Sequence, residues 1–237
     1  FIMIYLMRFS LATKQPAMTA ATMAKVLSEG NSRNTYIEFA HVVSQLFRSQ
    51  FIAFVGNVLL SFPVSLLIIY GLEVLFKQNF AFEKSGKLLY DLDPFHSKAI
   101  LHACIAGVFL FISGVISGNL SNSSVFYQIP KRIAKNPFIN YFFGQSFAKQ
   151  LSVYYSKNWA GIISNFWFGV FLGATAPVGL FLGLDLDIRH ITFAAGNFAL
   201  GLYGKDFVIS SSAFWIAFVT IFIIGFFNFA VSFGLSM

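Results

Sequence analysis

The sequence predicts an all-α polytopic membrane protein, a bundle of four to five membrane helices of which one is short or re-entrant. Of the 237 residues, 57% are hydrophobic and only 11% are charged, whereas charged residues make up about 25% of a soluble domain. Mean hydropathy is +0.72. Four apolar runs also reach the roughly 20 residues that a spanning helix needs. These observations place the chain among membrane proteins.

The first 50 residues contain shorter apolar segments. The run "FIMIYLM" before Arg8 is typical of the end of an apolar helix, so residues 1–9 are expected to close a preceding membrane helix of a longer protein. Residues 10–50 hold two helix candidates, one between Pro16 and Gly30 and one over 34–50 with an apolar face. We expect residues 10–50 to form a cytoplasmic helical hairpin at the membrane surface.

The remaining apolar runs predict two groups of membrane helices. A first helix pair is expected over 51–120, with spans at 51–76 and 99–120, and a second group over 161–237, with spans at 161–183 and 207–237. The run 191–204 falls short of the roughly 17 residues at the low end for a span. It is either a short span extended by its neighbours, which puts the C-terminus outside, or a re-entrant helix buried by protein, which puts it inside.

The charges between the spans predict their orientation. The connector 121–160 carries five cations and no acid, so the positive-inside rule places it in the cytoplasm, whereas 77–98 mixes both signs and should face the other side. The net charge of +7 then reflects orientation in a membrane rather than nucleic-acid binding. Within this basic cytoplasmic connector, lipid headgroups are the expected partners of Lys131, Arg132 and Lys135.

Asparagine recurs inside or beside the apolar runs, each time with Gly or Ser four positions later. Positions i and i+4 share a helix face, and small residues let membrane helices approach closely while an Asn hydrogen-bonds across the gap. The pattern predicts a polar seam that points into the bundle. It serves either as helix–helix adhesion or as a polar path or ligand site. The seam residues are Asn57, Asn119, Asn165, Asn197 and Asn228.

The densest polar cluster precedes the short run. Asp185, Asp187, Arg189 and His190 lie between two apolar segments, and they form either a charged turn at the membrane edge or a gate or orienting ion pair for a substrate or ion. Our hypothesis is that Asp187 pairs with Arg189 to fix the entry of the short helix, while His190 heads the seam.

The sequence contains no recognisable catalytic motif. It has no phosphate loop, no G-x-G-x-x-G, no H-E-x-x-H and no G-x-S-x-G. The single Cys104 excludes a disulfide within the chain and a cysteine-built metal site. We therefore assign no catalytic residue, no metal and no cofactor, and the sequence argues against an enzyme.

Four segments resemble a known family. They are "LATKQPAMTA" at 11–20, "FRSQFIAFVGNVLLSFPVSLL" at 47–67, "SGNLSNSSVFYQIPKRIAKNP" at 117–137 and "LDLDIRHITFAAGN" at 184–197. They are similar to the C-terminal membrane half of the bacterial transmembrane family named site-specific recombinase. The name implies DNA recombination, which needs Tyr or Ser among several arginines, yet the five arginines here are spread over both predicted sides. The activity would have to lie upstream, or the name does not describe it, and we favour the second.

Three functions remain open from the sequence. The first is a transport or envelope-maintenance module with an Asn/Gly-lined helix seam. The second is a membrane scaffold that anchors an upstream region of the same protein or a protein partner. The third is site-specific DNA recombination, as the family name implies. Membrane lipids are expected partners of any of these, and specific nucleic acid is not expected.

Overall fold

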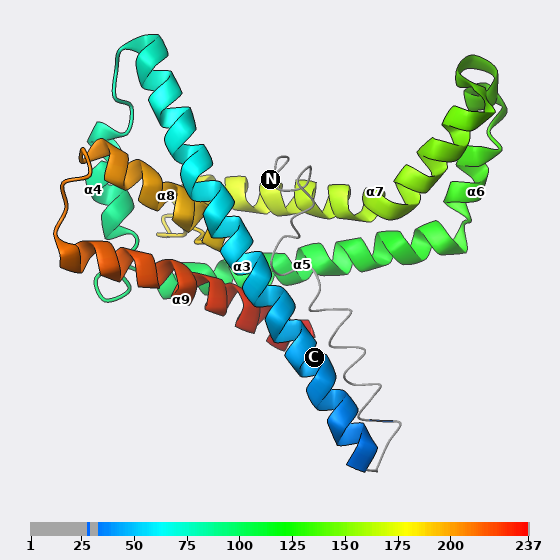
Figure 1. The fold of residues 1–237 in the computed structure, drawn as a ribbon, viewed down its shortest axis with the longest axis horizontal. Coiled ribbons are helices and arrows are strands. Elements are labelled where there is room, and N and C mark those ends of the chain that lie inside the picture. Colours follow the sequence, from blue (N-terminus) through cyan, green and yellow to red (C-terminus); the bar gives the residue numbers. More distant parts are fainter. Residues whose placement is uncertain (1–27, 29–32, 237) are drawn as a thin grey trace.

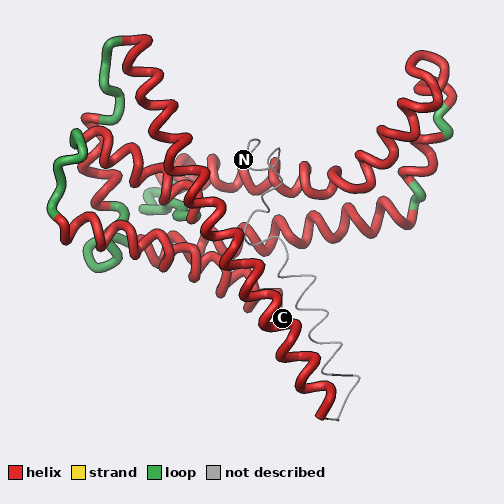
Figure 2. The backbone as a smooth tube through the Cα atoms, viewed as in Figure 1, coloured by secondary structure: helices red, strands yellow, loops and turns green. Residues whose placement is uncertain are grey.

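The computed structural model describes residue 28 and residues 33–236. These residues form helices joined by short connectors, and no strand occurs among them (Figure 2). The helices, labelled as in Figure 1, are α3 Arg33–Phe76, α4 Phe82–Tyr90, α5 Ala99–Phe126, α6 Ile129–Ala134, α7 Pro137–Phe181, α8 Ile191–Gly204 and α9 Ser211–Ser236.

Four of the described helices are long and apolar enough to cross a membrane. They are Phe39–Phe76, Ala99–Phe126, Pro137–Phe181 and Ser211–Ser236. Large apolar side chains such as Leu59, Leu67 and Leu75 on α3 are exposed, which is the arrangement that hydrocarbon rather than water stabilises. The predicted all-α membrane fold is confirmed, and the chain is a membrane protein.

The first span is part of a much longer helix. The expected end of a preceding helix at 1–9, and most of the expected hairpin at 10–50, lie outside the described residues. The second helix candidate, 34–50, is continuous with the first span in α3, because neither Gly nor Pro interrupts the chain between them. At 1.5 Å per residue α3 is about 66 Å long, so it extends well beyond a hydrocarbon core of roughly 30 Å.

The basic connector 121–160 is mostly helical. α5 continues to Phe126, and α7 begins at Pro137, where the Asn136 side chain accepts a hydrogen bond of 3.1 Å from the Ile139 N–H as an N-cap. Gly144, with φ 82°, bends α7 near its start. Figure 1 shows α5 and α7 side by side: α5 leads towards α6, and α7 returns from α6 towards α8. Scattered charges do not end a helix, so the helices continue past the ends of the expected spans.

α8 begins and ends at the two residues predicted for the short run. It is about 21 Å long at 1.5 Å per residue, and most of its residues are buried by packing against α3, α4 and α9. In Figure 1 it runs towards the end of the molecule that holds α4, and α9 then starts at that same end. Length, burial and direction favour a re-entrant helix over a span.

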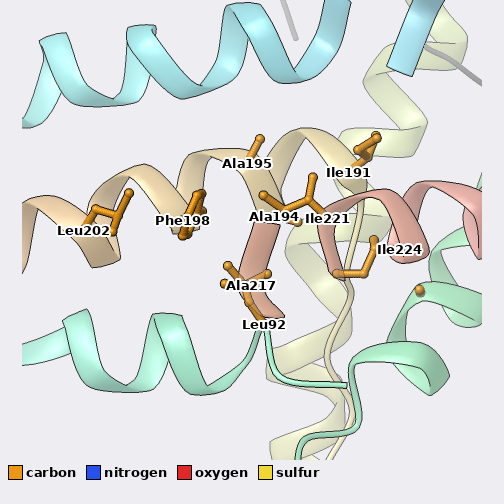
Figure 3. Packing of buried hydrophobic residues seen from close by; sticks show 10 residues of the cluster. Leu92, Ile191, Ala194, Ala195, Phe198, Leu202, Ala217, Ile221 and Ile224 are labelled. Carbon is orange, nitrogen blue, oxygen red and sulfur yellow. The ribbon is translucent and has the colours of Figure 1, made fainter. Parts of the chain in front are cut away.

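The main core forms where α8 meets α9. Ile191 and Phe198 of α8 pack with Ile221 and Ile224 of α9, and Leu92 joins them from the connector between α4 and α5 (Figure 3). The two helices approach closely at Gly225, where an added Cβ would lie 2.6 Å from Ile191 Cδ1. Arg189 and His190, the two polar residues directly before α8, are buried beside this packing.

The fold predicts which ends of the helices share a side of the membrane. Ser146, near the start of α7, and Ser210, between α8 and α9, are both exposed, and Figure 1 shows the start of α7 and the start of α9 at opposite ends. With the positive-inside rule, a cysteine at Ser146 should stay unlabelled by an impermeant thiol reagent in intact cells, whereas one at Ser210 should be labelled. Both should react after lysis, and the reverse pattern would contradict this orientation.

Candidate functional site: a buried polar joint at the start of α8

The side-chain amide of Asn228, on α9, joins three other parts of the chain. Its Nδ2 donates to the Ala103 carbonyl of α5 and to the Arg189 carbonyl, each at 2.9 Å. Its Oδ1 accepts from the Ile191 N–H at 3.1 Å, which is one of the backbone donors that a helix start leaves without an intrahelical partner. Asn228 is fully buried, so this amide is saturated inside the bundle.

Arg189 makes ion pairs with two carboxylates beside that joint. One is Asp187, two residues earlier, and the other is Asp91 at the end of α4, whose Oδ2 lies 2.8 Å from Nη2. The Arg189 side chain is only 8% exposed, against 17% for Asp91 and 38% for Asp187. A guanidinium can serve two carboxylates at once because its donors lie in a planar fork.

Further contacts fasten the connector before α8 to the start of α5. The Arg189 N–H donates to the His102 carbonyl, and a His102 ring nitrogen lies 3.3 Å from the Asp185 carbonyl oxygen. Lys98 Nζ lies 2.8 Å from Asp185 Oδ2 in an exposed pair. This bond from Lys98 lowers the pKa of the Asp185 carboxyl. The polar turn is therefore held by α4 and α5 as well as by its own residues.

His190 occupies the N-cap position of α8. Its Nδ1 accepts from the Thr192 N–H at 3.4 Å, and its ring meets the Phe168 ring of α7 edge to face, with centroids 5.2 Å apart. The side chain is fully buried. His190 therefore stabilises the first turn of α8 as its N-cap.

A second polar contact lies between α3 and α8. Ser61 Oγ donates to the Thr192 carbonyl at 2.6 Å, and an added Cβ at Gly196 would lie 2.9 Å from Ser65 Oγ. Asn57 precedes Ser61 by one turn on the same face. We call Asn57, Ser61 and Ser65 with Thr192 and Gly196 the α3–α8 seam. Asn57 is fully buried, and neither its amide nitrogen nor its amide oxygen has a hydrogen-bond partner.

The five predicted seam asparagines do not gather in one place. Asn228 and Asn57 are fully buried, Asn165 and Asn197 are half-buried, and Asn119 is exposed. Asn119 lies sixteen residues beyond Ala103 on α5, about 24 Å away at 1.5 Å per residue, and it accepts only from Ser123 of its own helix, at 3.4 Å. Asn119 therefore lies apart from Asn228, whereas Asn57 and Asn228 belong to α3 and α9, which both pack against α8.

The basic residues lie at the other end of the molecule. Lys131 and Arg132 are on α6 and Lys135 is its C-cap, and all three are exposed. Among the residues that the structure describes, no group of three His, Cys, Asp or Glu side chains could hold a metal ion.

Sequence reasoning missed Asp91 as a partner of Arg189. The two residues are almost a hundred positions apart, and only the packing of α4 beside α8 brings them together. The signal available was weak: Asp91 is an acid next to Leu92, a buried apolar residue, at a helix end. Asp187 is only two residues from Arg189, so that ion pair could be predicted from the sequence.

Comparison with known proteins places the chain in a family. The family model described as "Site-specific recombinase" matches residues 1–237, the whole chain, so the chain belongs to that family. Neither a curated protein nor a solved structure matches it.

The Asn228 joint predicts a large effect of one amide. In Asn228→Leu the Ile191 N–H and two carbonyls lose their partner in a buried site, where each unsatisfied group costs about 1–3 kcal/mol. Thermal unfolding in detergent should show a loss of about 2 kcal/mol or more. The matched control Asn119→Leu removes an exposed amide and should melt like the parent. Equal melting of the two variants would contradict the assigned role of Asn228.

The ion pairs predict a contrast between two aspartates. Asp91→Asn removes a mostly buried partner of Arg189, and breaking a buried pair costs up to about 3–5 kcal/mol. Because Asp187 remains, we expect about 1–3 kcal/mol by the same measurement. Asp185→Asn removes an exposed pair with Lys98 and should leave the unfolding temperature unchanged. A larger loss for Asp185→Asn than for Asp91→Asn would overturn this ranking.

Proposed function

From its membership of this membrane protein family and the geometry above, we propose that the chain is a transport or envelope-maintenance module of the bacterial inner membrane. The α3–α8 seam is its working part, and a small uncharged polar solute or water is what it handles. The observation that carries the proposal is the Asn57 amide, which is fully buried with both polar atoms unpartnered.

The position of Asn57 makes this observation informative. It lies within the candidate span Phe39–Phe76, and its side chain is fully buried, away from bulk water. An unpartnered amide in such a place costs several kcal/mol, and a buried polar atom left without a partner calls for a water, an ion or a functional role. Occupation of the seam by a polar molecule removes that cost.

The other face of the seam supports the same reading. Thr192 Oγ1 is also buried and without a hydrogen-bond partner, and Ser61 and Ser65 add hydroxyls from α3. These groups are neutral amides and hydroxyls, which match an uncharged polar solute better than an ion. Transporters commonly build their sites where a short or broken helix begins inside the membrane, and α8 is a short helix that is mostly buried in protein.

A scaffold is the second candidate, and the Asn228 joint favours it. That amide is saturated by three backbone groups, and Arg189 is neutralised by carboxylates. The Asn228 amide and the Arg189 guanidinium therefore hold helices together rather than line a path for a solute. A chain built chiefly around this joint would hold α3, with its long N-terminal extension, for an upstream region or a partner.

DNA recombination is the third candidate and rests on the family name. Arg48 lies on α3 and Arg132 on α6, whereas Arg189 lies in the connector before α8 and is paired with carboxylates. The described residues therefore do not assemble the arginine cluster that strand exchange needs. A sequence-selective shift of a duplex at about 200 mM salt would favour this candidate, because purely phosphate-driven binding weakens steeply with salt.

The proposal predicts opposite effects of Asn57→Leu on stability and on flux. Removing an unpartnered buried amide should raise the free energy of unfolding by about 1–3 kcal/mol. The same change should close the seam to polar solutes. Stopped-flow light scattering of proteoliposomes, challenged with water, glycerol, urea and neutral amino acids, should show flux above that of protein-free liposomes for the parent and none for Asn57→Leu.

Two controls make this test decisive. Asn119→Leu makes the same chemical change at an exposed position and should keep the parent's flux. Parent proteoliposomes that behave like empty liposomes for every solute would sink the transport proposal and leave the scaffold. A drop in the stability of Asn57→Leu would show that the amide is a structural contact.

A further inference from the structure

A pocket of about 470 Å³ opens between the end of α5, α6 and the first half of α7. Its polar lining includes Ser121 and Ser124 of α5 and Lys131 of α6. Its opposite wall is formed by the rings of Tyr155 and Trp159 of α7. One wall therefore offers a cation and hydroxyls, and the other offers apolar and aromatic surface.

The pocket exists because α6 is fastened to α7 rather than to α5. Gln128, with φ 50°, turns the chain sharply after α5. Ser152 Oγ then donates to the Pro130 carbonyl at 2.6 Å, and Asn140 Nδ2 donates to the Ala134 carbonyl at 3.3 Å. These two bonds hold α6 against α7 at both ends of the short helix and leave a wedge beside α5.

A second hollow of about 440 Å³ adjoins the first, since Gln128 and Lys131 line both. It adds Tyr127, Arg132 and Lys135 to the lining. The connector 121–160 contains no acid. No carboxylate of the described residues forms an ion pair with Lys131, Arg132 or Lys135. The described residues therefore leave the positive charge of Lys131, Arg132 and Lys135 without an ion-paired carboxylate.

We propose that these joined hollows bind the headgroup of an anionic phospholipid. Lys131 and Arg132 hold the phosphate and Ser121 and Ser124 offer hydroxyl donors, while the glycerol end of the acyl chains lies along Trp159. Cation clusters at the cytoplasmic end of spans attract anionic headgroups, and Trp and Tyr favour the same depth. The site is independent of the α3–α8 seam.

A lipid fits the surroundings of the pocket better than a soluble anion. Val125 and Phe126 beside it are 78% and 79% exposed, and such surface is stable only against acyl chains. A free phosphate would leave the wall of Tyr155 and Trp159 without a partner. The amphipathic lining matches one molecule that carries both a phosphate and hydrocarbon.

Trp159 allows the site to be tested directly. The chain has three tryptophans, so Trp167→Phe with Trp215→Phe leaves Trp159 alone to report on the pocket. The full chain is placed in bilayers that contain phosphatidylglycerol or phosphatidylcholine brominated near the glycerol end of the acyl chains. We expect phosphatidylglycerol to quench Trp159 at several-fold lower mole fraction than phosphatidylcholine.

Substitutions separate a specific pocket from general attraction. In this background, Lys131→Gln should weaken the preference about fivefold, as expected for one cation near an anionic lipid. The matched control Lys149→Gln removes an exposed cation of the same connector that lines neither hollow and should keep the preference. Both lysines are exposed, so both variants should fold.

The outcomes are distinct. Equal quenching by the two lipids, or an equal loss in Lys149→Gln and Lys131→Gln, would overturn the proposal. Displacement of phosphatidylglycerol by millimolar inorganic phosphate would assign the hollows to a free anion instead. Displacement by a short DNA duplex but not by phosphate would assign them to nucleic acid. Retention of the lipid against both competitors, with the loss confined to Lys131→Gln, is the expected result.

Discussion

The described fold depends on how the start of α8 is satisfied, because a helix whose first turn is buried in protein finds no water for its first backbone donors. The Asn228 amide accepts from the Ile191 N–H and donates to carbonyls of α5 and of the preceding connector. The His190 ring caps the next donor. These bonds fix α8 relative to α5 and α9, and the arginine with its two carboxylates ties the same point to α4.

The sequence predicted α8 better than the longer helices, for a physical reason. A charged turn precedes α8, which ends at Gly204 and is followed by Lys205 and Asp206, so local chemistry marks both ends. α3 continues beyond its apolar run, and α7 begins well before its own and is bent at Gly144. Hydropathy reports where apolar residues end rather than where the helix ends. The pairing of Arg189 with Asp91 was beyond reach, because it depends on tertiary packing of distant segments.

The recurring pattern of Asn with Gly or Ser four positions later specifies which helix face is polar but not what the amide binds. An Asn with Gly or Ser four positions later has one outcome at Asn228, where three backbone groups saturate the amide, and another at Asn57, where none does. At Asn119 the same pattern lies on an exposed surface. The spacing specifies a shared helix face, but the partner depends on which helix covers that face. The contrast between Asn228 and Asn57 therefore points to structure at one and to function at the other.

The two ends of the bundle also differ in how charge is neutralised. Near α4, Arg189 meets Asp91 and Asp187, and Lys98 meets Asp185, so the protein supplies both signs. Near α6, the described residues offer Lys131, Arg132 and Lys135 no ion-paired carboxylate. In the site that we propose in the wedge between α5, α6 and α7, an anionic headgroup supplies that counter-charge. The cations that the positive-inside rule predicts to orient the chain would then be the same cations that hold the headgroup.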